Sequence, residues 1–348
     1  YKRLKMYVHA EKSKVDQELE YGDLTCVIRI GSDMTENYYE YEVPLSFTPW
    51  GTIDPEVIWP FGNRFDIDLQ ALVDVKHRRN IAMRQPNSDI YQNIPYIEYD
   101  GPNKVTVLGK PSTSDVMAIM VGVRNPRKPG ETELEGINAE IWVNELRLTD
   151  FNDKSGWAAT GSVKADLADF GRVVFSGAYS TPNFGSLEQK IDQTQRESVS
   201  QLGVSTDLEL GKFFSEESGV KVPVHFDYTQ TVANPEYNPL DPDILMKDDL
   251  DSYTSEAAKD SVKQASQEFT ENTSINFINV RKDRTGATKK PKVYDIENFN
   301  VSYAYSTMYS RNIDIEYEKA KEHRGGIGYN FSTAPKNVRP FERIGFIS

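Results

Sequence analysis

The sequence predicts an all-β protein in two parts: a jelly-roll-like β-sandwich over residues 1–152, followed over residues 153–348 by antiparallel amphipathic strands of a partial transmembrane β-barrel. Short β-rich runs separated by Gly, Pro, Asn and Asp clusters fill the first part. Segments that alternate apolar and polar residues begin at Trp157 and recur along the second part. Several reach about 10 residues, the length of a tilted strand that crosses a bilayer, whereas soluble strands most often have about 5–6.

The first part is predicted to contain short strands and a single helix. The β-rich runs are 4–10, 24–30, 38–43, 105–109, 116–123 and 139–148. Between them, Phe65 to about Arg79 has apolar residues at helical spacing and cations in the last turn. Short strands with proline-rich connections are typical of a jelly-roll sandwich. The closing run, 139–148, resembles the last strand of carbohydrate-binding jelly rolls and discoidin-like modules, and the polar stretch Thr149–Gly156 is the expected linker.

The second part is predicted to contain eight long strands. Their ranges are about 157–167, 172–180, 201–211, 220–231, 272–281, 298–309, 311–319 and 324–333. In Val220–Tyr228, for example, every second residue is apolar. The fifth range alternates poorly, and Ser255–Phe269, inside the longest connection, has the spacing of a short amphipathic helix.

The first four strands are joined by connections that alternate in length. The connection 168–171 is tight and 181–200 is long, whereas 211–219 is moderate and 232–271 is the longest. Outer-membrane barrels have short periplasmic turns and long extracellular loops. If 168–171 is a periplasmic turn, the first strand runs inward from Trp157, and the sandwich lies on the extracellular side of the outer membrane.

Aromatic residues near strand ends have two interpretations. They could form an interfacial girdle, since amphipathic rings prefer the headgroup level of a bilayer, or they could close a soluble β-sandwich core. The residues are Trp157, Phe170, Tyr179, Phe213, Phe214, Tyr309 and Tyr329.

Charge and hydropathy narrow the class of partner. The net charge of -13 argues against nucleic acid, because duplex binding requires clustered basic surface. Mean hydropathy is -0.59, and no stretch approaches the roughly 18 consecutive apolar residues of a membrane helix. The single cysteine, Cys26, lies in an apolar run and is expected in the core.

No motif for catalysis, cofactor binding or metal binding is present, so we expect a protein that is not an enzyme and nominate no such residue. The four histidines, His9, His77, His225 and His323, lack metal-ligand spacing. We expect His225, beside Asp227, at a solvated position of the polar strand face. The acidic run 241–251 could hold calcium through its carboxylates, or it could be a solvated loop; the sequence leaves both open.

Six strings of residues, in order along most of the chain, resemble the SprA/Sov family. They are Lys2–Met6, Trp142–Leu148, Gly156–Gly161, Leu208–Phe214, Asn238–Asp243 and Tyr294–Phe299. The family comprises giant outer-membrane barrels of Bacteroidetes gliding motility and type IX secretion. The resemblance implies that this chain is an internal piece of a translocon that passes folded cargo through a wide pore. It also implies partners: outer-membrane lipid, secreted cargo proteins, and plug and shuttle subunits of the secretion system.

Two functions therefore follow from the sequence. The first is a structural part of a protein-conducting outer-membrane barrel with an attached sandwich. The alternative is a soluble or surface-attached glycan-binding protein built from β-sandwiches. Long strands with lipid-compatible faces, such as Val220–Tyr228 and Phe299–Tyr305, favour the first, whereas the highly polar loops are compatible with either.

Overall fold

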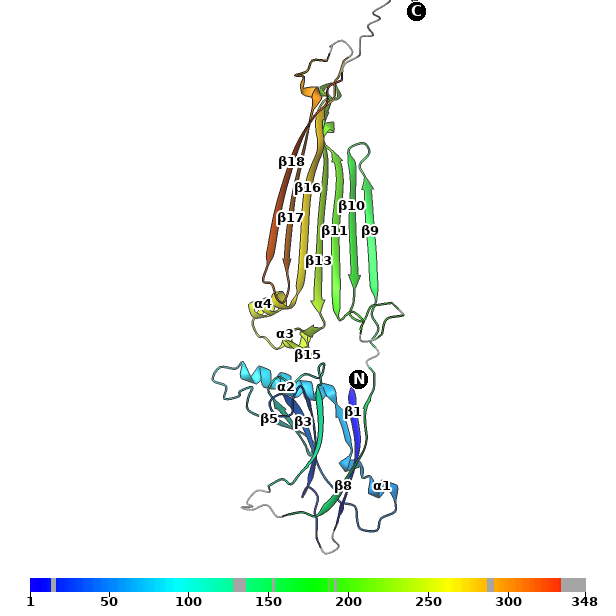
Figure 1. The fold of residues 1–348 in the computed structure, drawn as a ribbon, viewed down its shortest axis with the longest axis vertical. Helices are drawn as coiled ribbons and strands as arrows, with labels where there is room; N and C mark the ends of the chain where they lie inside the picture. The colour runs from blue at the N-terminus through cyan, green and yellow to red at the C-terminus, as the bar shows by residue number, and fades with distance from the viewer. Residues whose placement is uncertain are drawn as a thin grey trace, which may run out of the picture. The chain divides into compact units, whose positions relative to one another are not determined.

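The computed structural model describes residues 1–13, 17–127, 136–151, 154–186, 188–190, 193–286 and 291–332. The chain forms two compact units (Figure 1). The sandwich unit comprises Tyr1–Ser155 and Pro235–Ser266, and the long-strand unit comprises Gly156–Asn234 and the chain from Gln267 onward. No helix in the described residues is long and apolar enough to cross a membrane.

Two antiparallel sheets form the sandwich. One has the order β5-β6-β3-β2-β7 and the other the order β4-β1-β8. Their strands are β1 (Arg3–Lys12), β2 (Thr25–Gly31), β3 (Tyr38–Pro44), β4 (Phe65–Asp68), β5 (Tyr96–Asp100), β6 (Asn103–Leu108), β7 (Ala118–Arg124) and β8 (Ala139–Thr149). Alternate residues of the central strands face inward and form one buried core. The prediction of an all-β fold with a sandwich is confirmed, and Cys26 is fully buried in the core as expected.

Helix α2 (Leu69–Met83) closes one side of this core with Leu72 and Val75. The Asp68 carboxylate accepts a hydrogen bond from the Gln70 N–H at 3.0 Å and caps the helix. The predicted helix start at Phe65 was wrong, because Phe65–Asp68 is a strand that pairs with β1. A shorter helix, α1 (Pro55–Ile58), lies in the connection between β3 and β4.

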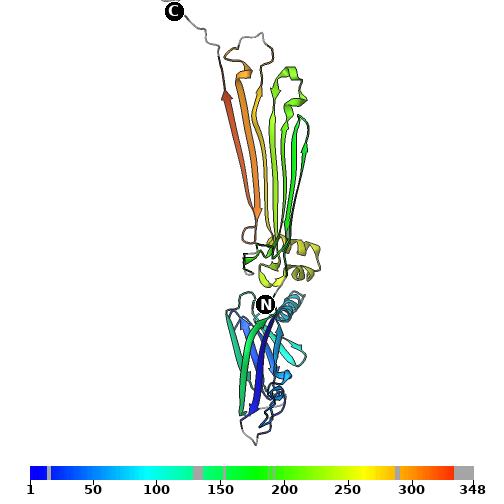
Figure 2. The same ribbon diagram turned by 90° about the vertical axis from the view of Figure 1, so that its right-hand side faces the viewer.

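The long-strand unit is one sheet with the order β18-β17-β16-β13-β11-β10-β9, seen from two directions in Figures 1 and 2. Its strands are β9 (Ala158–Asp166), β10 (Gly171–Ser180), β11 (Glu197–Glu209), β12 (Val220–Lys221), β13 (Pro223–Pro235), β16 (Glu268–Lys282), β17 (Phe299–Arg311) and β18 (Glu318–Tyr329). Short 3-10 helices lie in two of its connections, at Leu210–Phe213 and Glu216–Ser218 between β11 and β12 and at Ile296–Asn298 between β16 and β17.

The predicted strand 311–319 was wrong. Ile313, Ile315 and Tyr317 do alternate with polar residues, but the Asn312 side chain accepts hydrogen bonds from the N–H groups of Asp314 and Ile315 at 2.9 and 2.8 Å. An Asn that caps its own backbone in this way makes a turn. The turn joins β17 to β18, which begins at Glu318, before the predicted start at 324. The last residue of the predicted range 324–333 lies outside the described residues.

A β-bulge explains the poor alternation of the fifth predicted strand. The register between β16 and β17 shifts between Phe277 and Val280, and Asn279 has a positive φ of 57°. The one extra residue on β16 returns Val280 to the face that Phe277 occupies.

The segment Pro235–Ser266 was predicted as part of the second, long-strand region, but it belongs to the sandwich unit. Along the chain it connects β13 to β16. It contains β14 (Tyr237–Asn238), β15 (Asp241–Leu245), α3 (Met246–Asp251) and α4 (Glu256–Ser266), and we call it the docked insert. The chain therefore passes between the two units at the linker and at both ends of this insert. Part of the linker, residues 152–153, lies outside the described residues.

Candidate functional site

The pairing registers give the long-strand sheet one apolar face and one polar face. Val163 lies opposite Phe175, which lies opposite Val204 on the next strand. Further members of the apolar face are Tyr179, Leu202, Val224, Phe226, Ile275, Phe277, Val301, Tyr303, Tyr305 and Ile327. The polar face includes Lys164, Ser176, Ser205, Asp207, His225, Asp227, Ser274, Asn276, Ser302, Ser306, Glu322 and Arg324. Period-two alternation is thus matched across neighbouring strands, except in β18, which places Lys319, Lys321 and His323 on the apolar face.

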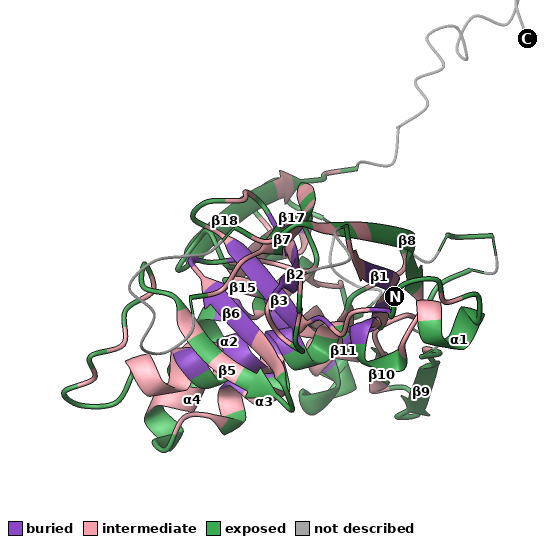
Figure 3. Cartoon of the chain, turned by 90° about the horizontal axis from the view of Figure 1, so that it is seen from below, coloured by how far each residue is buried: buried purple, intermediate pink, exposed green. Residues whose placement is uncertain are grey.

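The apolar face is exposed. Val163, Phe175 and Ile327 are 67%, 50% and 78% exposed, and the fully buried hydrophobic residues of the described chain lie almost entirely in the sandwich unit. Figure 3 shows this contrast between the buried sandwich strands and the exposed β9. Exposures this high mean that no second layer of the described unit covers the face. A contiguous apolar surface of this kind marks an interaction site.

Aromatic pairs lie near both ends of the strands. Phe299 and Tyr329 have ring centroids 5.0 Å apart at one end of the sheet, and Phe269 and Tyr309 are 5.9 Å apart near the other end. Phe299 and Tyr309 are ten positions apart on β17, which is about 34 Å along a strand at about 3.4 Å per residue. With a tilt of about 40°, the aromatic rows would be about 26 Å apart across a bilayer, close to the band of about 25 Å in membrane barrels.

Of the rings singled out in the sequence, two further pairs meet. Trp157 contacts Tyr179 with centroids 5.3 Å apart, and Phe170 contacts Phe213 at 5.0 Å. These pairs again lie where strands begin or end. Rings of this kind, placed at strand ends and left partly exposed, suit an apolar–aqueous boundary better than a closed core.

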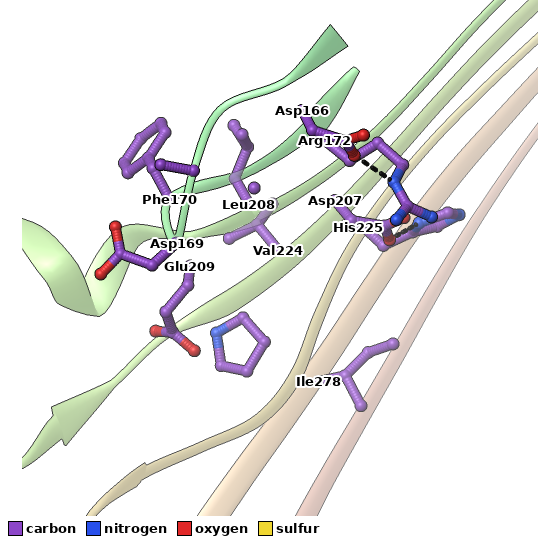
Figure 4. Close-up of a pocket in the computed structure, with 13 residues that line it drawn as sticks. Asp166, Asp169, Phe170, Arg172, Asp207, Leu208, Glu209, Val224, His225 and Ile278 are labelled. Carbon is purple, nitrogen blue, oxygen red and sulfur yellow. Dashed lines mark hydrogen bonds and ion pairs between the residues drawn. The ribbon is translucent and has the colours of Figure 1, made fainter. Parts of the chain in front are cut away.

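The polar face carries paired charges around a pocket of about 480 Å³ beside the β9–β10 turn (Figure 4). His225 lies between Asp207, whose Oδ1 is 2.6 Å from its Nδ1, and Asp227. At the pocket rim Arg172 donates to Asp166 at 2.8 Å. His225 therefore lies on the polar face beside Asp227, as predicted, and Asp207 is a second carboxylate partner that the sequence did not specify.

The described residues contain no group of three or more His, Cys, Asp or Glu side chains placed to hold a metal ion. The acidic run 241–251, left open for calcium, has other partners. The buried Lys76 ammonium contacts Asp241 and lies 2.5 Å from Asp243, and it also donates to the Pro111 carbonyl at 2.8 Å. Asp249 lies 3.4 Å from Arg84.

This cluster, which we call the Lys76 cluster, fixes the docked insert to the sandwich. The Tyr39 hydroxyl donates to Asp243 at 2.6 Å, and Asn80 donates to Asp241 at 3.0 Å. Burial raises the pKa of Tyr39 well above its usual range, and the neighbouring Asp243 adds to the shift. Burial also raises the pKa of Asp241, against the opposing effect of Lys76. Sequence reasoning missed the role of Lys76 because its carboxylate partners, Asp241 and Asp243, are more than 160 positions away.

The architecture is that of a two-unit β protein, with a closed core in one unit and an uncovered amphipathic sheet in the other. Residues 1–250 match the model of the SprA N-terminal family, described as motility related/secretion protein. The match extends from β1 to α3 and covers most of the chain, so the chain belongs to this family, and the resemblance found in the sequence is confirmed. Among curated proteins none matches the chain.

Proposed function

We propose that this chain is a structural part of a protein-conducting outer-membrane barrel of the type IX secretion and gliding machinery. The long-strand sheet would be a section of barrel wall, with its apolar face against lipid and its polar face toward a water-filled lumen. The observation that carries the proposal is the register, which collects apolar side chains on one uncovered face. Membership of a motility and secretion family supports the machinery named.

Strand length supports a wall rather than a soluble layer. The seven long strands have 9, 10, 13, 13, 15, 13 and 12 residues in chain order. A tilted strand needs about 9–11 residues to cross a bilayer. The edge strands β9 and β18 each have one neighbour in the described sheet, so further wall strands can pair with them.

The same proposal names the partners and the location. Lipid would contact the apolar face, secreted cargo would pass the polar face, and plug and shuttle subunits would bind the assembled machine. The sandwich unit would lie on the extracellular side. The soluble glycan-binding alternative would need a second layer over the apolar face, and the described residues do not supply one.

Lipid contact can be tested with single cysteines on neighbouring residues of opposite faces. Tyr303→Cys lies on the apolar face and Ser302→Cys on the polar face of the same strand. Each carries a fluorescent label in the full-length protein, reconstituted in vesicles with brominated lipid. We expect strong quenching for the label at 303 and little for the label at 302. Cys26 gives a low background, because it is buried and burial raises the pKa of its thiol to about 12.

Two results would overturn the proposal. Equal quenching at both positions would mean that the two faces meet the same environment. Recovery of the full-length protein in the soluble fraction without detergent would favour the glycan-binding alternative.

A further inference from the structure

Among the described residues, secondary-structure elements close the sandwich core on one side only. The three-stranded sheet is narrower than the five-stranded sheet that it faces. Helix α2 covers the core on the side of β4 and β6, where Leu72 and Val75 pack inward. On the opposite side the sheets end in β7 and β8, and each of these has one strand neighbour in the described chain.

Side chains of β7 that point toward the core remain exposed. Ile119, Val121 and Val123 lie directly opposite the core residues of β2, which are at most 5% exposed. Residues directly opposite one another on paired strands share a face. The three β7 side chains are nevertheless 48%, 36% and 48% exposed. The core therefore ends in an uncovered apolar strip at this edge.

Strand β8 has a matching strip. Val143 and Leu148 lie opposite Val8 and Leu4, which are buried, but are themselves 49% and 46% exposed. A β-bulge at Glu145, whose φ is 53°, shifts the register and leaves Leu146 on the same side as Leu148. We call the gap between these two strips the open seam.

The backbone groups of the strand edges and the charge of Glu140 indicate which ligand the open seam can bind. Each free strand edge offers N–H and C=O groups without a strand partner in the described chain, which is a template for strand addition. On the outward side of β8, Glu140 lies directly opposite Glu11. Like charges in this position repel, and a cation on an added strand beside Glu140 would relieve the repulsion.

We propose that the open seam binds a β-strand donated by another polypeptide. The donor strand pairs along the free edge of β8, inserts apolar side chains at alternate positions over Val121 of β7, and carries Lys or Arg beside Glu140. The described strands of the sandwich unit all pair within its own sheets, and we assign the donor to another polypeptide. This inference does not depend on the proposed membrane location.

The test is peptide binding to the whole chain in detergent. The probe is a nine-residue fluorescent peptide that alternates Val or Ile with Thr and has one central Lys. Fluorescence anisotropy measures its affinity, and hydrogen–deuterium exchange locates it. We expect binding with new protection of amides in Ala139–Thr149. A peptide of the same composition without the alternation should not protect this segment.

Two isoleucines provide a matched pair of variants. Ile119→Asp places a charge in the open seam, whereas Ile97→Asp changes an equally exposed residue on the other edge of the same sheet. We expect Ile119→Asp to weaken peptide binding ~10- to 100-fold, since it removes the burial of about one large aliphatic side chain. Ile97→Asp should leave binding unchanged.

Exchanging the charges of residue 140 and of the central peptide residue distinguishes specific from non-specific peptide binding. Glu140→Lys should weaken binding of the Lys peptide and strengthen binding of a peptide with Glu at the central position. The proposal is refuted if the alternating peptide does not protect β8, if the non-alternating peptide protects it equally, or if the two isoleucine variants behave alike. The proposal would also be contradicted if Glu140→Lys left the affinities of both peptides unchanged.

Discussion

At the scale of single residues, adjacent side chains of one strand meet different surroundings. Val204 lies on the apolar face of β11. Ser205, the next residue, lies on the polar face, directly opposite Val174 of β10. The backbone is the same for both, and only the pleat separates them. A difference between matched substitutions at these two positions therefore measures the environment of each face.

We expect Val204→Arg to destabilise the full-length protein in a bilayer by about 2–4 kcal/mol, the cost of arginine on the lipid face near the midplane. Ser205→Arg should cost less than about 1 kcal/mol, because its side chain remains in water. Denaturant titration of the protein in lipid vesicles measures both values. Equal losses would show that both faces are buried, either in a soluble core or against a plug.

A second residue-scale prediction concerns pH and Glu42 in the sandwich. Burial alone would raise the pKa of Glu42, but hydrogen bonds from Lys104 and Thr25 and the charges of Lys104 and Arg124 outweigh it, so the pKa is lowered. A lowered carboxylate pKa gives stability that is present above the ordinary value of 4.5 and is lost as pH falls through the folded-state value.

The sandwich should therefore lose stability as pH falls below about 4.5. Glu42→Gln should cost about 1.5–3 kcal/mol at pH 7, the range for hydrogen bonds to a charged group. The difference in unfolding free energy between the variant and the wild type should become smaller at acid pH. Thermal unfolding of both proteins at several pH values provides the check, and a difference that stays constant down to low pH would disprove the assignment.

At the scale of elements, a cluster of buried charges contacts the docked insert, which also buries Ile244 and Met246. Lys76 has no exposed side-chain surface, and the Asp243 side chain is 1% exposed. A buried ion pair is expensive to form, and removal of one partner leaves an uncompensated charge. The insert should therefore depend strongly on the Lys76 cluster.

We expect Lys76→Met to destabilise the sandwich unit by about 3–5 kcal/mol, because Asp241 and Asp243 lose their buried cation. Lys247→Met, at an exposed position of the same insert, should change stability by no more than about 0.5 kcal/mol. Hydrogen–deuterium exchange over 235–266, together with an unfolding curve, measures both effects. Little effect from Lys76→Met would show that other contacts hold the insert.

At the scale of the whole molecule, three chain crossings join the two units, at 155–156, 234–235 and 266–267. All three leave the long-strand sheet at the same end, where β9 begins, β13 ends and β16 begins. Because the insert returns to the sandwich, a single cut in the linker does not separate the units.

A protease site placed between Ser155 and Gly156 tests this arrangement. After cleavage, the fragment that contains β1–β8 should remain bound to the rest of the protein through the Lys76 cluster. It should be released by denaturant or in the Lys76→Met background. Size-exclusion chromatography after cleavage gives the result, and spontaneous release of the wild-type fragment would contradict the docking.

The proposed membrane orientation makes a second prediction at this scale. Asn87 lies in the sandwich unit and Asn183 in the loop after β10, whereas Asp169 lies in the tight β9–β10 turn at the other end of the sheet. Cysteine at 87 or 183 should react with a membrane-impermeant thiol reagent in intact cells, and cysteine at 169 should not. Labelling at 169 without the other two would invert the orientation.

The β class, the core position of Cys26 and the two faces of the long strands could be read from the sequence. The two faces depend on local period-two alternation along each strand, and the core position of Cys26 depends on the apolar run around it. The aromatic residues at strand ends could also be predicted, because the alternation indicates where each strand begins and ends. The turn at Asn312 was missed because Ile313 and Ile315 continue the apolar alternation, while a side chain–backbone hydrogen bond decides the local conformation.

Only the tertiary structure decided where distant segments meet. Lys76 and Asp243 are 167 positions apart, and nothing in either local pattern indicates the other. The assignment of 235–266 to the sandwich follows from this contact, and the open seam follows from the unequal widths of two sheets. Alternation specifies which way a side chain points, whereas burial and charge pairing depend on what the rest of the chain places opposite it.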